Sequence, residues 1–389
     1  MGKNIVNPRF FWLDMARAIS AFCVCAGHLR RTMLLDYRDV THPTILHIVF
    51  YALAGVANQA VIVFFVLSGF FVGGSVLQSG KNFSLANYAL ARLTRLWLVL
   101  FPALILTFCI DKVTSVYHPG FVHGVYADCW NLGTGDGTYS VSLKTLVGNI
   151  LSLQTIIVPV FGSNAPLWSL ANEFWYYCLF PACVLAARRG VKKCYRILAG
   201  LCACVILAFL PAKMLMGYLI WLMGAVAWVI CRRTDWKPSF APILVALFFF
   251  LASLGYPVME KVLSVSAGAV CRDIIVGVGF APLCVILAKL SPPELGFISY
   301  LIVKYSVFSA KFSYSLYLIH FPCIFLMVSL LNGDKKILMK PDALGIALFC
   351  GLFAALIVVA VCFWFLFEKR TAVVRAFFKR QLIQRQNVA

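Results

Sequence analysis

Long apolar runs separated by short polar connections make up most of the chain. An α-helix crosses a bilayer with roughly 17–25 mostly apolar residues, and most of the runs have that length. The pattern therefore predicts an all-α, polytopic membrane protein with about ten transmembrane helices. The predicted spans are 11–31, 49–77, 93–110, 164–187, 197–210, 214–231, 239–255, 267–288, 312–331 and 343–367.

The composition agrees with a membrane protein. Hydrophobic residues make up 62% of the chain and charged residues 12%, with a mean hydropathy of +0.91, whereas a soluble domain carries about 25% charged residues. The first apolar run is as long as a full span and lacks a small-residue cleavage site, so we expect an uncleaved first helix. We expect one membrane-embedded domain over 1–389 with no appended extracellular domain.

The net charge of +20 is distributed unevenly. Lys and Arg concentrate in the connections between spans, so the positive-inside rule explains the charge and we expect no nucleic-acid partner. If the N-terminus is cytoplasmic, the basic segment 188–196 and the basic tail at about 368–389 lie on the same side. The distribution therefore predicts that both termini are cytoplasmic.

The 15 cysteines lie almost entirely within the apolar runs. An odd number of thiols in lipid-buried positions indicates small packing residues rather than a disulfide framework. We expect no metal site.

The first span carries three residues that are costly in lipid: Asp14, Arg17 and His28. Arg17 and His28 are 11 residues apart, close to three helical turns, so they share a face with a rise of about 16 Å between them. Asp14 precedes Arg17 by three residues and is spaced to pair with it. Taken singly, His28 is explained by a hydrogen bond near the helix end and Arg17 by snorkelling. Three such residues on one face favour a polar interior.

A second polar stripe lies in the predicted span 164–187. Ser169, Glu173 and Tyr177 (or Tyr176) recur at helical spacing, and Glu173 has no basic neighbour in sequence. A buried carboxylate needs a partner from another helix. Pairing with His28 would fix the imidazole tautomer and favour a general base; the alternative is that Glu173 only joins helices.

Three further sets complete the candidates. Arg92 and Arg95 start a span at the cytoplasmic side and suit a phosphate clamp, although ordinary positive-inside anchoring explains them too. Tyr317 and His320 share a helix face with Ser313. The external connection at about 111–163 contains aromatic residues such as Trp130, which offer apolar faces to an acceptor.

Six stretches resemble, in order, the signature blocks of acyltransferase family 3, the integral-membrane acyltransferases that modify bacterial surface glycans. The blocks are LDMARAISAFCVCAGH, VFFVLSGFF, RLTRLWLVLFP, LWSLANEFWYY, FSYSLYLIHFP and FEKR. The family's glutamate block often reads SLSVE, whereas this chain reads SLANE, with Asn172 beside the acid.

The resemblance implies transfer of an acyl group, usually acetyl from acetyl-CoA, to a hydroxyl of a glycan or polysaccharide outside the bacterial inner membrane. In this reading Arg17, Arg92 and Arg95 bind the CoA phosphates at the cytoplasmic side, and His28, steadied by Glu173, is the base. An acyl-histidine intermediate is the variant. The substrate-contacting or supporting residues are Asp14, Ser169, Tyr177, Tyr317, His320 and Trp130.

Two other classes of protein fit the buried charges. A transporter or flippase would use the same residues to move a solute, but transporters usually show two repeated halves and this chain shows none. A non-catalytic scaffold for polysaccharide assembly would tolerate loss of Arg17 and His28. Membrane lipids are the expected surroundings in each case, and the pattern leaves the oligomeric state open.

Overall fold

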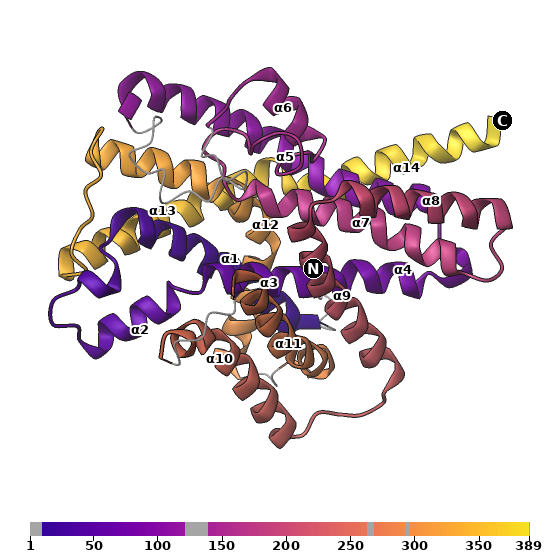
Figure 1. Ribbon diagram of the computed structural model, residues 1–389, viewed down its shortest axis with the longest axis horizontal. Helices are drawn as coiled ribbons and strands as arrows, with labels where there is room; N and C mark the ends of the chain where they lie inside the picture. Colours follow the sequence, from indigo (N-terminus) through magenta and orange to yellow (C-terminus); the bar gives the residue numbers. More distant parts are fainter. Residues whose placement is uncertain (1–9, 121–138, 263–267, 293–295, 389) are drawn as a thin grey trace. The chain divides into compact units, whose positions relative to one another are not determined.

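The computed structural model describes residues 10–120, 139–262, 268–292 and 296–388. The regular elements of these residues are all helices, which confirms the all-α prediction (Figure 1). The helices are α1 (Phe11–Met33), η2 (Tyr37–Asp39), α2 (Ile45–Leu53), α3 (Ala57–Ser68), η3 (Gly69–Gly73), α4 (Gly74–Gln78), η4 (Gly80–Asn82), α5 (Leu85–Tyr117), α6 (Leu143–Ile150), α7 (Leu167–Ala187), α8 (Lys193–Phe209), α9 (Ala212–Arg233), α10 (Phe240–Val262), α11 (Gly268–Lys289), α12 (Phe297–Asn332), α13 (Ala343–Leu366), η7 (Glu368–Arg370) and α14 (Thr371–Val388).

Among the described residues, six helical stretches are long and apolar enough to cross a membrane. The polar residues Asp14, Arg17 and His28 lower the mean hydropathy of α1, and α8 has only 17 residues. The count of ten and the orientation of the termini therefore stay predictions. The six stretches are Ile45–Gln78, Leu85–Tyr117, Ala212–Arg233, Gly268–Lys289, Tyr300–Asn332 and Ala343–Gln381.

The chain folds into two compact units, each built from three segments. The first unit comprises 1–20, 58–82 and 172–310, and the second comprises 21–57, 83–171 and 311–389. The division falls within α1, α7 and α12, each of which contributes residues to both units. The expectation of a single domain stays a prediction.

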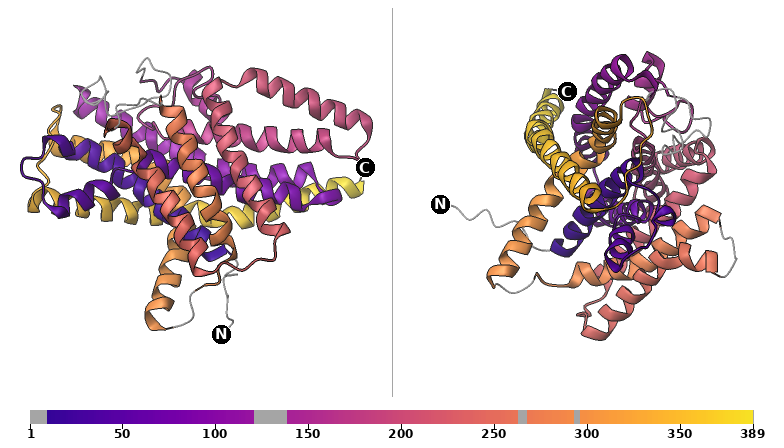
Figure 2. Two further views of the ribbon diagram at one scale, coloured as in Figure 1. Left: turned by 60° about the horizontal axis from the view of Figure 1, so that its bottom comes forward. Right: turned by 90° about the vertical axis from the view of Figure 1, so that its left-hand side faces the viewer.

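Small residues let helices of the first unit approach closely. Helix α11 packs against both α9 and α10 (Figure 2), and α9 also packs on η3, a five-residue π-helix. A methyl group at Gly69 would meet the carbonyl oxygen of Trp221, and one at Gly224 would meet that of Val66. Glycine at both positions therefore permits the backbone contact that holds membrane helices together.

The second unit is organised around the long helix α5, along which α14 packs (Figure 1). Helix α13 contacts α1 through Phe353 and Phe22, whose ring centroids are 6.2 Å apart. At the end of α13, Glu368 Oε2 accepts hydrogen bonds from the backbone N–H of Ser315 (3.1 Å) and from its hydroxyl (2.6 Å). Ser315 is fully buried and Glu368 is partly exposed, and their contact joins α12 to η7, which follows α13.

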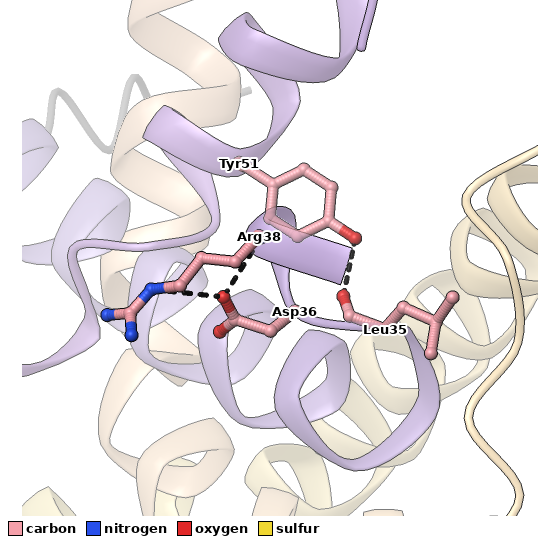
Figure 3. Close-up of polar contacts among 4 residues, drawn as sticks. All are labelled: Leu35, Asp36, Arg38 and Tyr51. Carbon is pink, nitrogen blue, oxygen red and sulfur yellow. Dashed lines mark hydrogen bonds and ion pairs between the residues drawn. The ribbon is translucent and has the colours of Figure 1, made fainter. Parts of the chain in front are cut away.

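The connection that follows α1 is also fixed by polar contacts, shown in Figure 3. Tyr51 of α2 donates its hydroxyl to the Leu35 carbonyl oxygen at 2.6 Å, and Asp36 accepts from the backbone N–H of Arg38 to cap η2. The Arg30 guanidinium lies 5.2 Å from the centroid of the Tyr51 ring. The C-terminal end of α1, which carries His28, is thus held in place within the second unit.

Candidate active site

Two histidines from distant parts of the chain meet in the second unit. Nδ1 of His28, on α1, lies 2.8 Å from Nε2 of His320, on α12. The ring planes are within 9° of parallel and the centroids are 5.1 Å apart, so a proton on one nitrogen lies close to the line between them. The Phe321 ring lies nearly perpendicular to the His28 ring, with centroids 5.1 Å apart. His28 is partly exposed, whereas His320 is fully buried.

The backbone of α12 holds the second ring nitrogen of His320. Nδ1 lies 2.8 Å from the Tyr317 carbonyl oxygen and 3.1 Å from that of Leu316. Both contacts are with residues one helical turn earlier, so the sequence order within α12 is enough to position the ring. The orientation of His320 is therefore set locally, and that of His28 follows from it.

A proline shapes the same helix. Pro322 lies inside α12 and has no N–H to donate to the Leu318 carbonyl four residues earlier. A buried carbonyl needs another donor, and Asn164 supplies it, with Nδ2 2.8 Å from the Leu318 oxygen. The same amide lies 3.1 Å from Thr107 Oγ1 of α5. Asn164 therefore ties the segment before α7 to both α12 and α5.

A buried carboxylate anchors that segment to α5. Asp111 Oδ2 accepts from the backbone N–H of Ser163 at 2.9 Å, and Asp111 is 1% exposed. Gly162 has a φ of 55°, and a methyl group there would meet the carboxylate; both facts require glycine. Burial and the neighbouring Asp111 charge raise the pKa of the Tyr139 phenol.

Two predicted supporting residues meet beside the histidines. Ser169 Oγ, at the start of α7, lies 2.6 Å from the Tyr317 hydroxyl oxygen. Both hydroxyls also lie within reach of the Pro166 carbonyl oxygen, at 3.2 Å and 3.3 Å. A chain of contacts therefore runs from Ser169 through Tyr317 to His320 and on to His28.

The predicted phosphate-binding arginines lie near the start of α5 in the same unit. Arg92 is half-buried, with its guanidinium 5.9 Å from the Tyr88 ring centroid and its Nε lacking a hydrogen-bond partner. Arg95, one turn later, is exposed. Within the described part of the chain neither arginine makes an ion pair. Two cationic groups without a counter-charge suit an anionic ligand.

In the first unit, Arg17 is paired within its own helix. Its Nη1 lies 3.0 Å from Asp14 Oδ1, the i, i+3 contact that the spacing predicts. Its guanidinium also lies 4.8 Å from the ring centroid of Phe71, a residue of the π-helix η3. Such single-turn π-helices are frequent at functional sites.

Glu173 is also placed in the first unit, at the end of a directed chain of hydrogen bonds. The Trp221 indole N–H donates to Ser68 Oγ at 3.1 Å, and Ser68 lies 3.1 Å from the Tyr177 hydroxyl. Tyr177 in turn donates to Glu173 Oε2 at 3.1 Å. Tyr176, by contrast, donates to the Met214 carbonyl oxygen at 2.6 Å. Of the two tyrosines that the sequence leaves open, Tyr177 contacts the carboxylate.

Each unit contains only some of the predicted site residues. His28, His320, Tyr317 and Ser169 form one connected group in the second unit. Glu173 belongs to the first unit, so its pairing with His28 stays a prediction, as does a joint phosphate site of Arg17 with the α5 arginines. Trp130 lies outside the described residues.

Sequence reasoning missed several contributing residues. Pro322 was the signal that could have led to Asn164, because a proline within an apolar span leaves a carbonyl in need of a donor. Glu368 is the acid of the FEKR block at the end of the last span, but the sequence analysis assigned it no role. Ser68 carried no signal of its own apart from its block VFFVLSGFF.

A family model described as an acyltransferase domain matches residues 10–367. The chain therefore belongs to this acyltransferase family, as the six sequence blocks predict. Together with its long apolar helices, this makes the protein a membrane acyltransferase and selects that class over a transporter or a scaffold. No curated protein and no solved structure matches the chain.

Proposed function

We propose that the protein transfers an acetyl group from acetyl-CoA to a hydroxyl of a cell-surface glycan in the bacterial inner membrane, with His28 as the general base. The observation that carries the proposal is the 2.8 Å contact between His28 Nδ1 and His320 Nε2. It holds the imidazole by one nitrogen. Nε2 of His28 makes no hydrogen bond with any described residue of the second unit and is available to take a proton.

The donor side of the proposal rests on Arg92 and Arg95. Coenzyme A carries three phosphates, and guanidinium groups bind phosphate through paired, charge-assisted hydrogen bonds. The buried, unpartnered Nε of Arg92 and the exposed side chain of Arg95 support this role. Arg17, already oriented by Asp14 and Phe71, is proposed as a third phosphate ligand.

The proposed chemistry is a single displacement. The acceptor hydroxyl oxygen bonds to the thioester carbonyl carbon while His28 Nε2 takes the hydroxyl proton. The carbon–sulfur bond then breaks, and the thiolate receives that proton from His28. The products are an acetyl ester and the CoA thiol, and His28 returns to its starting state.

Attack on the thioester by His28 itself, giving an acyl-imidazole, is the alternative route. The two routes differ in whether the protein becomes labelled when radioactive acetyl-CoA is supplied without acceptor. Ser169, Tyr317 and Glu173 are proposed as supports of the imidazole or the acceptor, and Trp130 as an acceptor contact on the external side.

The test in cells compares surface polysaccharide with and without the gene by NMR of acetyl groups. We expect an acetyl signal that disappears on deletion, returns with the wild-type gene and does not return with a His28→Ala variant that inserts normally. Unchanged acetyl signals in the deletion strain would overturn the proposal.

A further inference from the structure

The contacts of His320 determine which of its nitrogens carries the proton. Its Nδ1 faces the Tyr317 and Leu316 carbonyl oxygens at 2.8 Å and 3.1 Å. A carbonyl oxygen only accepts, so Nδ1 of His320 must be the donor. In a neutral imidazole the other nitrogen then bears a lone pair, and Nε2 of His320 must be an acceptor.

The same reasoning applies to Nδ1 of His28, which lies 2.8 Å from Nε2 of His320. An accepting Nε2 on His320 requires a donating Nδ1–H on His28. We propose that His320 is a positioning residue that fixes the Nδ1–H tautomer of His28 and so leaves Nε2 of His28 as the base. The inference rests on the proposed function for its catalytic meaning, but the tautomer itself is independent of it.

The burial of His320 prevents its two hydrogen bonds from being exchanged for others. His320 is 0% exposed, so water is not available to replace either of its contacts, and a buried ring nitrogen without a partner is costly. The Phe321 ring packs nearly perpendicular to both imidazoles, with its centroid 5.1 Å from that of His28 and 6.3 Å from that of His320. Neither ring turns over without losing a hydrogen bond.

The tautomer defines a complete proton cycle. When Nε2 of His28 takes the acceptor's proton, the imidazolium keeps its Nδ1–H bonded to neutral His320, which stabilises the positive charge. When the thiolate leaves, the proton at Nε2 is returned to sulfur. His320 keeps its own Nδ1 proton throughout, so it acts through His28 without touching a reacting atom.

Two substitutions at His320 distinguish the effect of its hydrogen-bond acceptor from the effect of its side-chain volume. In His320→Gln the side-chain oxygen reaches the position of Nε2 and restores an acceptor for His28 Nδ1–H. In His320→Leu an apolar side chain of similar size offers none. His118, at the C-terminal end of α5, provides the matched control His118→Gln.

The first measurement is ¹⁵N NMR of the full-length protein, labelled at histidine, in detergent or nanodiscs. The His28 signals are assigned from their loss in His28→Gln. We expect a protonated Nδ1 and an unprotonated Nε2 on His28 in the wild type and in His320→Gln, and loss of that single tautomer in His320→Leu. A wild-type His28 with its proton on Nε2 would overturn the inference, whatever the activity.

The second measurement is kcat and KM for acetyl-CoA. We expect His320→Leu to lower kcat about 100-fold, at the lower end of general-base effects, with KM unchanged. His320→Gln should keep at least about a tenth of the wild-type kcat, and His118→Gln should match the wild type. Equal losses in the Gln and Leu variants, with both normally folded, would contradict a positioning role. If instead His28→Gln is fully active, the proposed function fails while the NMR result still decides the tautomer.

Discussion

Ser169 Oγ lies 2.6 Å from the hydroxyl oxygen of Tyr317. Through this contact the start of α7 supports the turn of α12 whose carbonyl oxygens hold His320. Removing either hydroxyl should loosen the ring that orients His28. One neutral hydrogen bond contributes about 1 kcal/mol, so we expect Ser169→Ala and Tyr317→Phe each to lower kcat about fivefold.

Because the two hydroxyls act through one contact, the double variant should lose little more than either single variant. The control is Tyr305→Phe, an exposed tyrosine earlier on α12. Additive losses in the double variant would show that the two hydroxyls act independently.

The arginines of α5 should affect donor binding rather than the chemical step. Hydrogen bonds to charged groups contribute roughly 1.5–3 kcal/mol. Arg92→Gln and Arg95→Gln should therefore each raise KM for acetyl-CoA about 10- to 100-fold with little change in kcat. Arg38→Gln, at an exposed arginine of the connection after α1, should leave KM unchanged.

A donor without the 3′-phosphate sharpens the same test. If one arginine binds that phosphate, its replacement should matter less with the shortened donor than with acetyl-CoA. Loss of kcat at constant KM in both arginine variants would contradict the assignment.

The neighbouring tyrosines of α7 should behave differently. Tyr177 donates to Glu173, so Tyr177→Phe should lower the rate a few-fold with a normal thermal unfolding midpoint. Tyr176 is fully buried and donates to the Met214 carbonyl, so Tyr176→Phe should cost about 1 kcal/mol of stability and leave the activity of the folded protein intact. A loss of stability in Tyr177→Phe and a loss of rate in Tyr176→Phe would show that Tyr177 does not belong to the site.

The crossing of η3 and α9 should tolerate no added methyl group. At Gly69 a methyl group meets the Trp221 carbonyl oxygen, whereas at Gly351 of α13 it meets nothing within 4 Å. Overpacking costs roughly 1–3 kcal/mol, while alanine is favoured over glycine in an open helix by up to about 1 kcal/mol. Unfolding in detergent should show Gly69→Ala destabilised and Gly351→Ala unchanged or stabilised. Equal effects would contradict the close crossing.

Hydropathy alone predicted most of the helical pattern, because apolar side chains must face lipid or other helices. It placed the start of the last but one span at 312, whereas α12 begins at Phe297. Residues such as Lys304 and Lys311 end the apolar run. The helix itself continues past that run, because polar turns remain helical where they do not face lipid. The prediction for α5 was short at its start for the same reason.

The spacing within α1 predicted the pair of Asp14 with Arg17, which depends only on helix geometry. The partner of His28 was harder, because hydropathy does not determine which helices pack against each other. His320 was singled out on its own helix face, but the contact with His28 joins residues 292 positions apart. Only the fold brings them together.

The most direct test of the central claim measures thiol release from acetyl-CoA by the purified full-length protein with bacterial surface polysaccharide as acceptor. We predict acceptor-dependent release by the wild type and by His118→Gln, and a loss of at least about 100-fold in His28→Gln. Thiol release by His28→Gln at the wild-type rate would contradict the account.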